Sequence, residues 1–174
     1  MINLKLPISK NNRLEYYNYS HTGAYFITIC IKDRKPILSK IVGTGVPDCP
    51  KTVFLPYGEI ADRYIKKLNI FYDNISVDKY IIMPDHIHLL VSILNGQSRT
   101  PVPTYSNIKT ENKNSTISNF VSTFKRFCNK EYGENIWQSR YYDHVIRNQE
   151  DYNEIFEYIE NNPKKYLLKK NQDS

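Results

Sequence analysis

The stretch that decides the fold is Met83-Pro84-Asp85-His86-Ile87-His88-Leu89-Leu90-Val91. It lies in a longer apolar segment, 80–94, whose Ile, Val and Leu residues are typical of one or two adjacent β-strands. Successive side chains of a strand point to opposite faces, so His86 and His88 emerge on the same face, about 7 Å apart along the strand. Two neutral imidazoles at that spacing can share one divalent metal ion. A single histidine in a strand is more often an ordinary core or surface residue, but the pair predicts a metal or phosphate site.

The overall composition indicates a soluble globular protein with an anionic partner. The chain has 174 residues, the length of one domain, and is 40% hydrophobic and 24% charged. No segment is long and apolar enough for a membrane span, so we expect no membrane partner. The net charge is +6, and aromatic residues make up 13% of the chain, including 15 tyrosines. Basic grooves with aromatic side chains bind single-stranded nucleic acid, although basic proteins are common and most tyrosines are structural.

The cysteines give a prediction about the redox compartment. Cys30, Cys49 and Cys128 are scattered along the chain, without the CxxC spacing of a zinc knuckle. Their number and spacing also argue against a disulfide framework. We therefore expect a cytoplasmic protein, because thiols stay reduced in that compartment.

The hydrophobic pattern predicts elements in the order β-α-β-β-α-β, followed by a C-terminal helix. The expected strands cover 24–31, 75–82, 86–94 and 136–147, and the expected helices cover 57–71, 116–132 and 149–162. Segment 38–55 is expected to be irregular or a short hairpin, and segment 95–116 a flexible connection. Pro163 is expected to end the last helix, leaving a polar tail from about residue 168.

This order of elements is that of a ferredoxin-like split βαβ fold. We therefore predict a single α+β domain over residues 1–174. It would have an antiparallel sheet, helices on one face, and an additional C-terminal helix. On that last helix, Tyr158 and Asn162 are four residues apart and lie on one stripe beside the apolar face. Taken alone, a tyrosine in such a place is usually a packing residue, and an asparagine before proline usually ends a helix.

Several motifs, taken in order, resemble the single-tyrosine HUH transposases. The pair His86 and His88 follows Met83-Pro84-Asp85, and the sequence YIENNP occurs late in the chain, at 158–163. Segments 23–28, 137–138 and 142–148 are also similar to the REP-associated branch of that family. The resemblance spans about residues 12–168, and the ordered combination is far more specific than any one motif.

The resemblance implies an activity and a set of site residues. Members of this family cut and rejoin single-stranded DNA, often beside hairpins, through a covalent 5′-phosphotyrosine. Carried over, Tyr158 would be the nucleophile, and His86, His88 and Asn162 would bind a divalent metal, Mg²⁺ or Mn²⁺. Related insertion-sequence transposases commonly have glutamine in place of Asn162. Two imidazoles and an amide oxygen favour Mg²⁺ or Mn²⁺ over structural zinc. The implied partner is hairpin-containing single-stranded DNA, bound by a monomer or a homodimer.

Further residues are candidates for contacts with the nucleic acid. The candidate phosphate contacts are Arg34, Lys35, Lys125, Arg126, Arg140 and Arg147, although any one such residue is more often ordinary surface. We expect His144 to have a packing or surface role, and Asp85 to face away from the metal as a turn residue or DNA contact. Trp137, Tyr141 and Tyr142 could stack on bases or fill the core.

The leading hypothesis is therefore a metal-dependent, single-strand-specific DNA endonuclease and strand transferase. The alternative is a non-cleaving regulator that binds DNA or RNA hairpins on the same fold. A third interpretation, a replication-initiation or relaxase nuclease, shares the chemistry. Those proteins often place the tyrosine differently or carry further domains.

Overall fold

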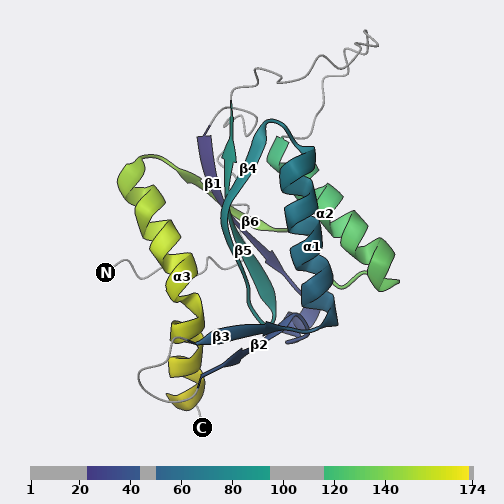
Figure 1. Cartoon of the computed structure of the whole chain (residues 1–174), viewed down its shortest axis with the longest axis vertical. Helices are drawn as coiled ribbons and strands as arrows, with labels where there is room; N and C mark the ends of the chain where they lie inside the picture. The colour runs from purple at the N-terminus through teal and green to yellow at the C-terminus, as the bar shows by residue number, and fades with distance from the viewer. Residues whose placement is uncertain (1–22, 44–49, 95–115, 173–174) are drawn as a thin grey trace.

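The computed structural model describes residues 23–43, 50–94 and 116–172, and is built around an antiparallel four-stranded sheet of order β4-β5-β1-β6 (Figure 1). The strands are β1 Gly23–Cys30, β4 Ile75–Ile82, β5 His86–Ile93 and β6 Tyr142–Ile146, and the helices are α1 Pro56–Phe71, α2 Thr116–Tyr132 and α3 Gln149–Gln172. The unit β1-α1-β4 encloses β5, and the unit β5-α2-β6 encloses β1. Each βαβ unit is thus split by a strand of the other, which confirms the predicted ferredoxin-like arrangement.

The two faces of the sheet receive different helices. Helices α1 and α2 cover one face, and α3 crosses the other (Figure 1). On β1, Tyr25 and Ile27 belong to the main core, which packs against α1 and α2. Phe26 points the other way and forms a smaller group, the α3 cluster, with Ile155 and Ile159 of α3. Strand alternation therefore decides which side chains of the sheet can meet α3.

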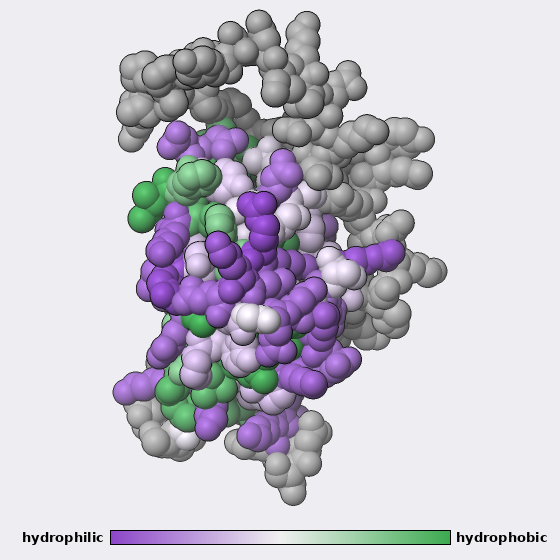
Figure 2. All heavy atoms as spheres, turned by 90° about the vertical axis from the view of Figure 1, so that its right-hand side faces the viewer, coloured by the Kyte–Doolittle hydropathy of each residue, from purple (hydrophilic) through white to green (hydrophobic). Residues whose placement is uncertain are grey.

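The outward side of the α1–α2 layer is mostly hydrophilic, interrupted by apolar patches (Figure 2). The exposed large apolar side chains of α1 include Ile70 and Phe71, near its end. Within the described part of the chain, no helix combines the length and the apolar character needed to cross a membrane.

A short hairpin lies between β1 and α1. Of the two alternatives expected for segment 38–55, irregular structure or a short hairpin, the structure shows the hairpin. Strands β2 (Ser39–Val42) and β3 (Lys51–Phe54) form a two-stranded antiparallel sheet, and residues 44–49 lie outside the described ranges. A short 3-10 helix, η1 (Lys32–Arg34), precedes the hairpin. The first turn of α1 approaches the hairpin so closely that a Cβ on Gly58 would lie 2.0 Å from the carbonyl oxygen of Leu38.

The prediction that Pro163 ends the last helix is wrong, as is the polar tail from about residue 168. Helix α3 continues through Pro163 to Gln172. The proline φ angle suits a helix, so the cost is one lost hydrogen bond and a local clash. Packing offsets this cost: Pro163 is buried, and the second half of α3 contacts the hairpin, where Leu167 lies against Gly43.

Two other predicted segments differ from the structure or lie outside it. The strand expected over 136–147 is regular only at Tyr142–Ile146, and Trp137 makes a single bridge with Ile31. The connection at 95–116 falls outside the described residues except for its last residue, which begins α2. Helix α2 ends at Tyr132, followed by Gly133 in the left-handed region at φ 76°, as predicted.

Candidate functional site

The two histidines at the start of β5 direct their Nε2 atoms toward each other. The chain enters β5 through a tight turn, in which the Met83 amide donates to the His86 carbonyl over 2.8 Å. Strand alternation then places both imidazoles on the face that α3 covers. The Nε2 atoms of His86 and His88 are 3.1 Å apart. Two nitrogen ligands at about 2.1 Å from one ion lie about 3 Å apart when they subtend a right angle, so this spacing fits a shared divalent cation.

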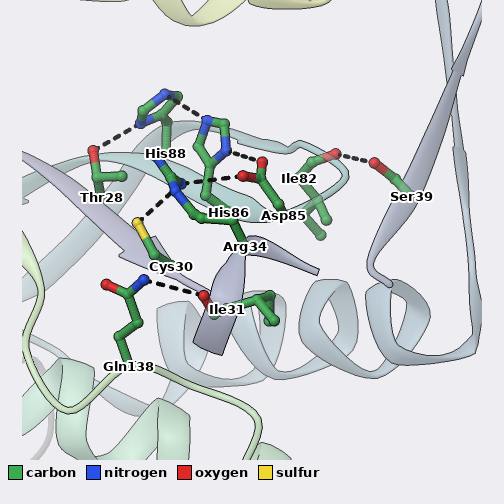
Figure 3. Close-up of polar contacts among 10 residues, drawn as sticks. All are labelled: Thr28, Cys30, Ile31, Arg34, Ser39, Ile82, Asp85, His86, His88 and Gln138. Carbon is green, nitrogen blue, oxygen red and sulfur yellow. Dashed lines mark hydrogen bonds and ion pairs between the residues drawn. The ribbon is translucent and has the colours of Figure 1, made fainter. Parts of the chain in front are cut away.

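The outer nitrogen of each imidazole has its own partner (Figure 3). His86 Nδ1 donates to Asp85 Oδ1 over 2.6 Å, and His88 Nδ1 lies 2.8 Å from Thr28 Oγ1. The Asp85 carboxylate can only accept, so it places the proton of His86 on Nδ1 and leaves the Nε2 lone pair free, the usual arrangement around metal-binding histidines. The Thr28 hydroxyl can donate to or accept from His88 Nδ1, so it orients that ring without selecting its tautomer. The carboxylate of Asp85, which was expected to be a turn residue or DNA contact, binds the outer nitrogen of His86. Asp85 belongs to the turn, so strand alternation does not govern the direction of its side chain.

Burial and nearby charges shift the pKa values of His88 and Asp85. His88 is fully buried, and burial, followed by the charges of His86 and Arg34, holds its pKa well below the ordinary value. Burial alone would raise the pKa of Asp85. The hydrogen bond from His86 and the charges of His86 and Arg34 nevertheless lower it. The result is a neutral imidazole at His88 and a carboxylate at Asp85, the forms suited to metal binding.

Helix α3 brings Tyr158 of the same chain against the histidines. The Tyr158 ring contacts His88, with ring centroids 5.4 Å apart, and meets the edge of Phe26 at 5.8 Å. The ammonium of Lys165 lies 5.0 Å from the centre of the same ring. Asn162 follows one turn later and is 9% exposed. The structure thus brings together His86, His88 and Tyr158, with Asn162 on the adjacent turn of α3.

Several contacts along its length fix α3 over the site. Asn148 accepts a hydrogen bond from the Asp151 amide over 2.8 Å and so caps the helix. Tyr152 donates its hydroxyl to Asp78 of β4 over 3.1 Å. Lys79 forms an ion pair with Glu160 at 3.5 Å. Together with the α3 cluster, these contacts determine the position of the tyrosine relative to the sheet.

The basic candidates differ in what their side chains contact. Arg34 lies 3.3 Å from Asp85 and is the basic candidate whose side chain contacts the histidine turn. Lys35, Arg126, Arg140 and Arg147 are exposed. The ammonium of Lys125 donates to the carbonyls of Gln138 and Arg140 over 2.7 and 3.1 Å, contacts that the sequence did not predict. Burial lowers the pKa of Lys125 to about 8. It therefore holds the segment before β6 in place.

The other polar and aromatic candidates make contacts with side chains of the fold itself. His144 is half-exposed and pairs with Asp151 at 3.0 Å at the start of α3, in keeping with a surface role. Trp137 fills the main core beside Phe124. The hydroxyl of Tyr141 lies 2.9 Å from that of Ser118.

Sequence reasoning missed Asp85, Thr28 and Arg34 as parts of this arrangement. Thr28 is sixty residues from His88 in the chain and reaches it only through the pairing of β1 with β5. The sequence does hold a signal for that pairing, because both strands are apolar runs interrupted by single polar residues. The register that places Thr28 opposite His88 comes from the assembled sheet.

Comparison with known proteins identifies the family. The chain matches the family model described as IS200-like transposase over residues 19–162, and it belongs to that family. An uncharacterized protein of Haemophilus influenzae is 29% identical over 160 residues, covering 87% of this chain and 86% of the relative. The family and the fold support a transposase function.

A solved structure shares the fold. It is a REP-associated tyrosine transposase bound to a REP hairpin, with a TM-score of 0.61 and 21% identity, covering 88% of this chain and 74% of that chain. The family match and this shared fold confirm the predicted resemblance to REP-associated tyrosine transposases.

Proposed function

We propose that this protein is a metal-dependent endonuclease and strand transferase that cuts single-stranded DNA near hairpins through a 5′-phosphotyrosine. The observation that carries the proposal is the contact between Tyr158 and His88 within one chain. A tyrosine beside a pair of convergent imidazoles joins a nucleophile to a cation-binding group. The hairpin in the structure of the similar transposase supports the choice of substrate.

The donor set fits a divalent ion with one further oxygen ligand. The two Nε2 atoms converge, and each Nδ1 is already held by a neighbouring side chain. Among the described residues, no group of three or more His, Cys, Asp or Glu side chains is arranged for a metal. The third protein ligand in the proposal is the amide oxygen of Asn162, which the resemblance to the single-tyrosine transposases implies and which lies on the turn of α3 next to Tyr158. The amide oxygen beside the two imidazoles favours Mn²⁺ or Mg²⁺, and a bound ion of this kind would offset charge developing on the scissile phosphate.

The proposed chemistry is an exchange of phosphodiester bonds. The phenol of Tyr158 loses its proton to solvent and its oxygen attacks phosphorus, forming the Tyr–O–P bond. The bond from phosphorus to the 3′-oxygen breaks, and that oxygen takes up a proton and leaves as a free 3′-OH. Rejoining reverses these changes with another 3′-OH. The exchange conserves the number of phosphate ester bonds, so it requires no external energy source.

The residues around Tyr158 assist this role. Packing against Phe26 and His88 holds the ring in one orientation, which reduces the entropy lost in reaching the phosphate. The Lys165 ammonium near the ring would stabilise a developing phenolate. The exposed arginines and Lys35 would bind the phosphate backbone.

A gel assay with labelled hairpin DNA tests the proposal. With Mn²⁺ present, DNA labelled at its 3′ end should become covalently attached to the wild-type protein, whereas DNA labelled at its 5′ end should yield a shorter free strand. Tyr158→Phe should abolish both products, because it lacks the nucleophilic oxygen. Tyr166→Phe, on the same helix, is the matched control and should behave like the wild type.

Two outcomes would contradict the assignment. An adduct formed by Tyr158→Phe would mean that another residue is the nucleophile. Tight hairpin binding by the wild type, with no adduct under any divalent metal, would favour a non-cleaving hairpin-binding regulator.

A further inference from the structure

Arg34 contacts the histidine turn through the Asp85 carboxylate. Its Nη1 atom lies 3.3 Å from Asp85 Oδ2, while the other carboxylate oxygen, Oδ1, accepts from His86 Nδ1 over 2.6 Å (Figure 3). The carboxylate therefore has one oxygen on the guanidinium and the other on the imidazole. Rotation of Asp85 would break both contacts, so each partner restricts the other.

A second contact directs Arg34 to this place. The same Nη1 atom lies 3.2 Å from the sulfur of Cys30. Cys30 is the residue of β1 directly paired with His86 of β5. The guanidinium thus lies against both strands at the point where the first histidine emerges.

The backbone around Arg34 is strained in a way that fits such a role. Asp33 and Arg34 both have left-handed backbones, with φ of 56° and 55°, and neither residue is glycine. Non-glycine residues adopt this conformation at a cost in free energy, and they keep it only when surrounding contacts require it. Left-handed residues at these positions turn the chain after β1, so that the Arg34 side chain lies back against the strand end.

The surrounding backbone fixes this loop to the histidine turn on both sides. Before it, the Ile31 amide donates to the Asp85 carbonyl over 2.9 Å. After it, the Leu38 amide donates to the Pro84 carbonyl over 2.9 Å. Gln138 adds a hydrogen bond to the Ile31 carbonyl at 3.2 Å. The loop and the turn therefore form one rigid unit.

We propose that Arg34 is a positioning residue for the histidine pair, which holds the orientation of His86 through Asp85. The inference rests on the proposed function, because it takes His86 and His88 as metal ligands. It replaces the simple phosphate contact expected for Arg34 from the sequence. The class of ligand whose binding depends on Arg34 is a divalent cation, with Mn²⁺ as the probe.

The main test compares Mn²⁺ affinity, without DNA, in the wild type and Arg34→Gly. Glycine accepts the left-handed backbone without strain, so this variant should fold at least as stably as the wild type, with an equal or higher Tm. Loss of a side chain that orients a metal ligand should weaken Mn²⁺ binding about tenfold or more. Arg34→Lys should give an intermediate affinity, because it restores the charge without the planar fork.

Two further measurements separate positioning from DNA contact. Hairpin affinity in EDTA should change less than twofold in Arg34→Gly. The nitrogen NMR signals of His86 should show loss of the Nδ1-protonated tautomer in metal-free Arg34→Gly. Lys40→Ala, in β2 and exposed, is the matched control and should retain wild-type Mn²⁺ affinity and the wild-type tautomer.

Each contrary result has a distinct meaning. If Arg34→Gly binds Mn²⁺ like the wild type while His88→Ala does not, the positioning role is wrong and the proposed metal site stands. If Arg34→Gly instead weakens hairpin binding in EDTA and leaves Mn²⁺ affinity unchanged, Arg34 is a phosphate contact. If the wild type binds no Mn²⁺, both the positioning role and the metal site are wrong.

Discussion

At the scale of single residues, His88 shows how the sheet supplies a partner that the local sequence does not contain. Its ring is fully buried, and its Nδ1 atom lies 2.8 Å from the hydroxyl oxygen of Thr28 on the neighbouring strand. Without that hydroxyl, the buried Nδ1 atom of His88 would lack a hydrogen-bond partner. Thr28 therefore contributes to both the stability of the sheet and the direction of the Nε2 lone pair.

Thr28→Val tests this role, because valine has nearly the shape of threonine without the hydroxyl. We expect Mn²⁺ affinity to fall about tenfold. Urea unfolding should show a loss of about 1–3 kcal/mol, the cost of a buried unsatisfied group. Thr123→Val is the control, since Thr123 accepts a hydrogen bond from Tyr72 at 3.3 Å in the α1–α2 layer. Equal Mn²⁺ binding by Thr28→Val and the wild type would contradict the proposed orientation of His88.

The sequence reveals part of this residue-scale arrangement. Alternation along one strand is a local property, so the common face of His86 and His88 could be predicted from spacing alone. The direction of Asp85 depends on a turn, and that of Arg34 on two left-handed residues, so neither follows from periodicity. Lys125 was expected at the surface because lysines usually lie there, whereas its ammonium meets carbonyls that the fold brings from residues 138–140.

At the scale of elements, the contact between α1 and the β2–β3 hairpin depends on one missing side chain. Leu38 donates its amide to the histidine turn and accepts from Leu55 at the start of α1 over 2.9 Å. Gly58 lies in the first turn of α1, against the same Leu38 carbonyl. The helix can approach this closely only because glycine has no Cβ.

Gly58→Ala should therefore destabilise the protein although alanine favours helices. A Cβ at 2.0 Å from a backbone oxygen forces the helix or the hairpin to move. We expect a loss of about 2–4 kcal/mol in urea unfolding, in the range of substitutions that disrupt buried packing. Gly133→Ala meets open space but a φ of 76°, so it should cost about 1 kcal/mol. A smaller loss in Gly58→Ala than in Gly133→Ala would show that α1 can shift freely.

The presence of most helices and strands could be predicted from the sequence more accurately than the residues at which they end. Helix α1 and strands β1, β4 and β5 have clear apolar periodicity, and the structure confirms them nearly residue for residue. Pro163 misled the prediction for α3 because local propensity favours a stop there. Tertiary packing against the hairpin outweighs that local cost, and contacts between distant elements cannot be seen in the sequence of the helix itself.

At the scale of the whole molecule, the candidate site is assembled within one chain. The tyrosine helix lies over the histidines of its own sheet, held by Asp78 and Lys79 of β4. The predicted order of elements implied that a final helix would return to the sheet. The order of elements did not specify which face of the sheet α3 would cover. That choice depends on the polar and apolar sides of all four strands together.

A mixing experiment tests whether the site functions within one chain. His86→Ala and Tyr158→Phe should each fail to form an adduct with hairpin DNA, and an equimolar mixture should fail as well. Wild-type protein diluted with Tyr158→Phe should retain activity in proportion to its own amount. Recovery of the adduct in the mixture would mean that one chain donates its tyrosine to the histidines of another.

The division of the sheet into two faces has a consequence for how this protein can evolve. The main core, which carries most of the buried apolar residues, lies behind the sheet, whereas Tyr158 and the histidines lie in front of it. A gene copy that lost Tyr158 would still encode a folded, basic chain. On the proposed function, selection for cutting and selection for folding act on opposite faces of the same strands. On the proposed function, descendants could lose catalysis through one substitution and keep the fold for a new role.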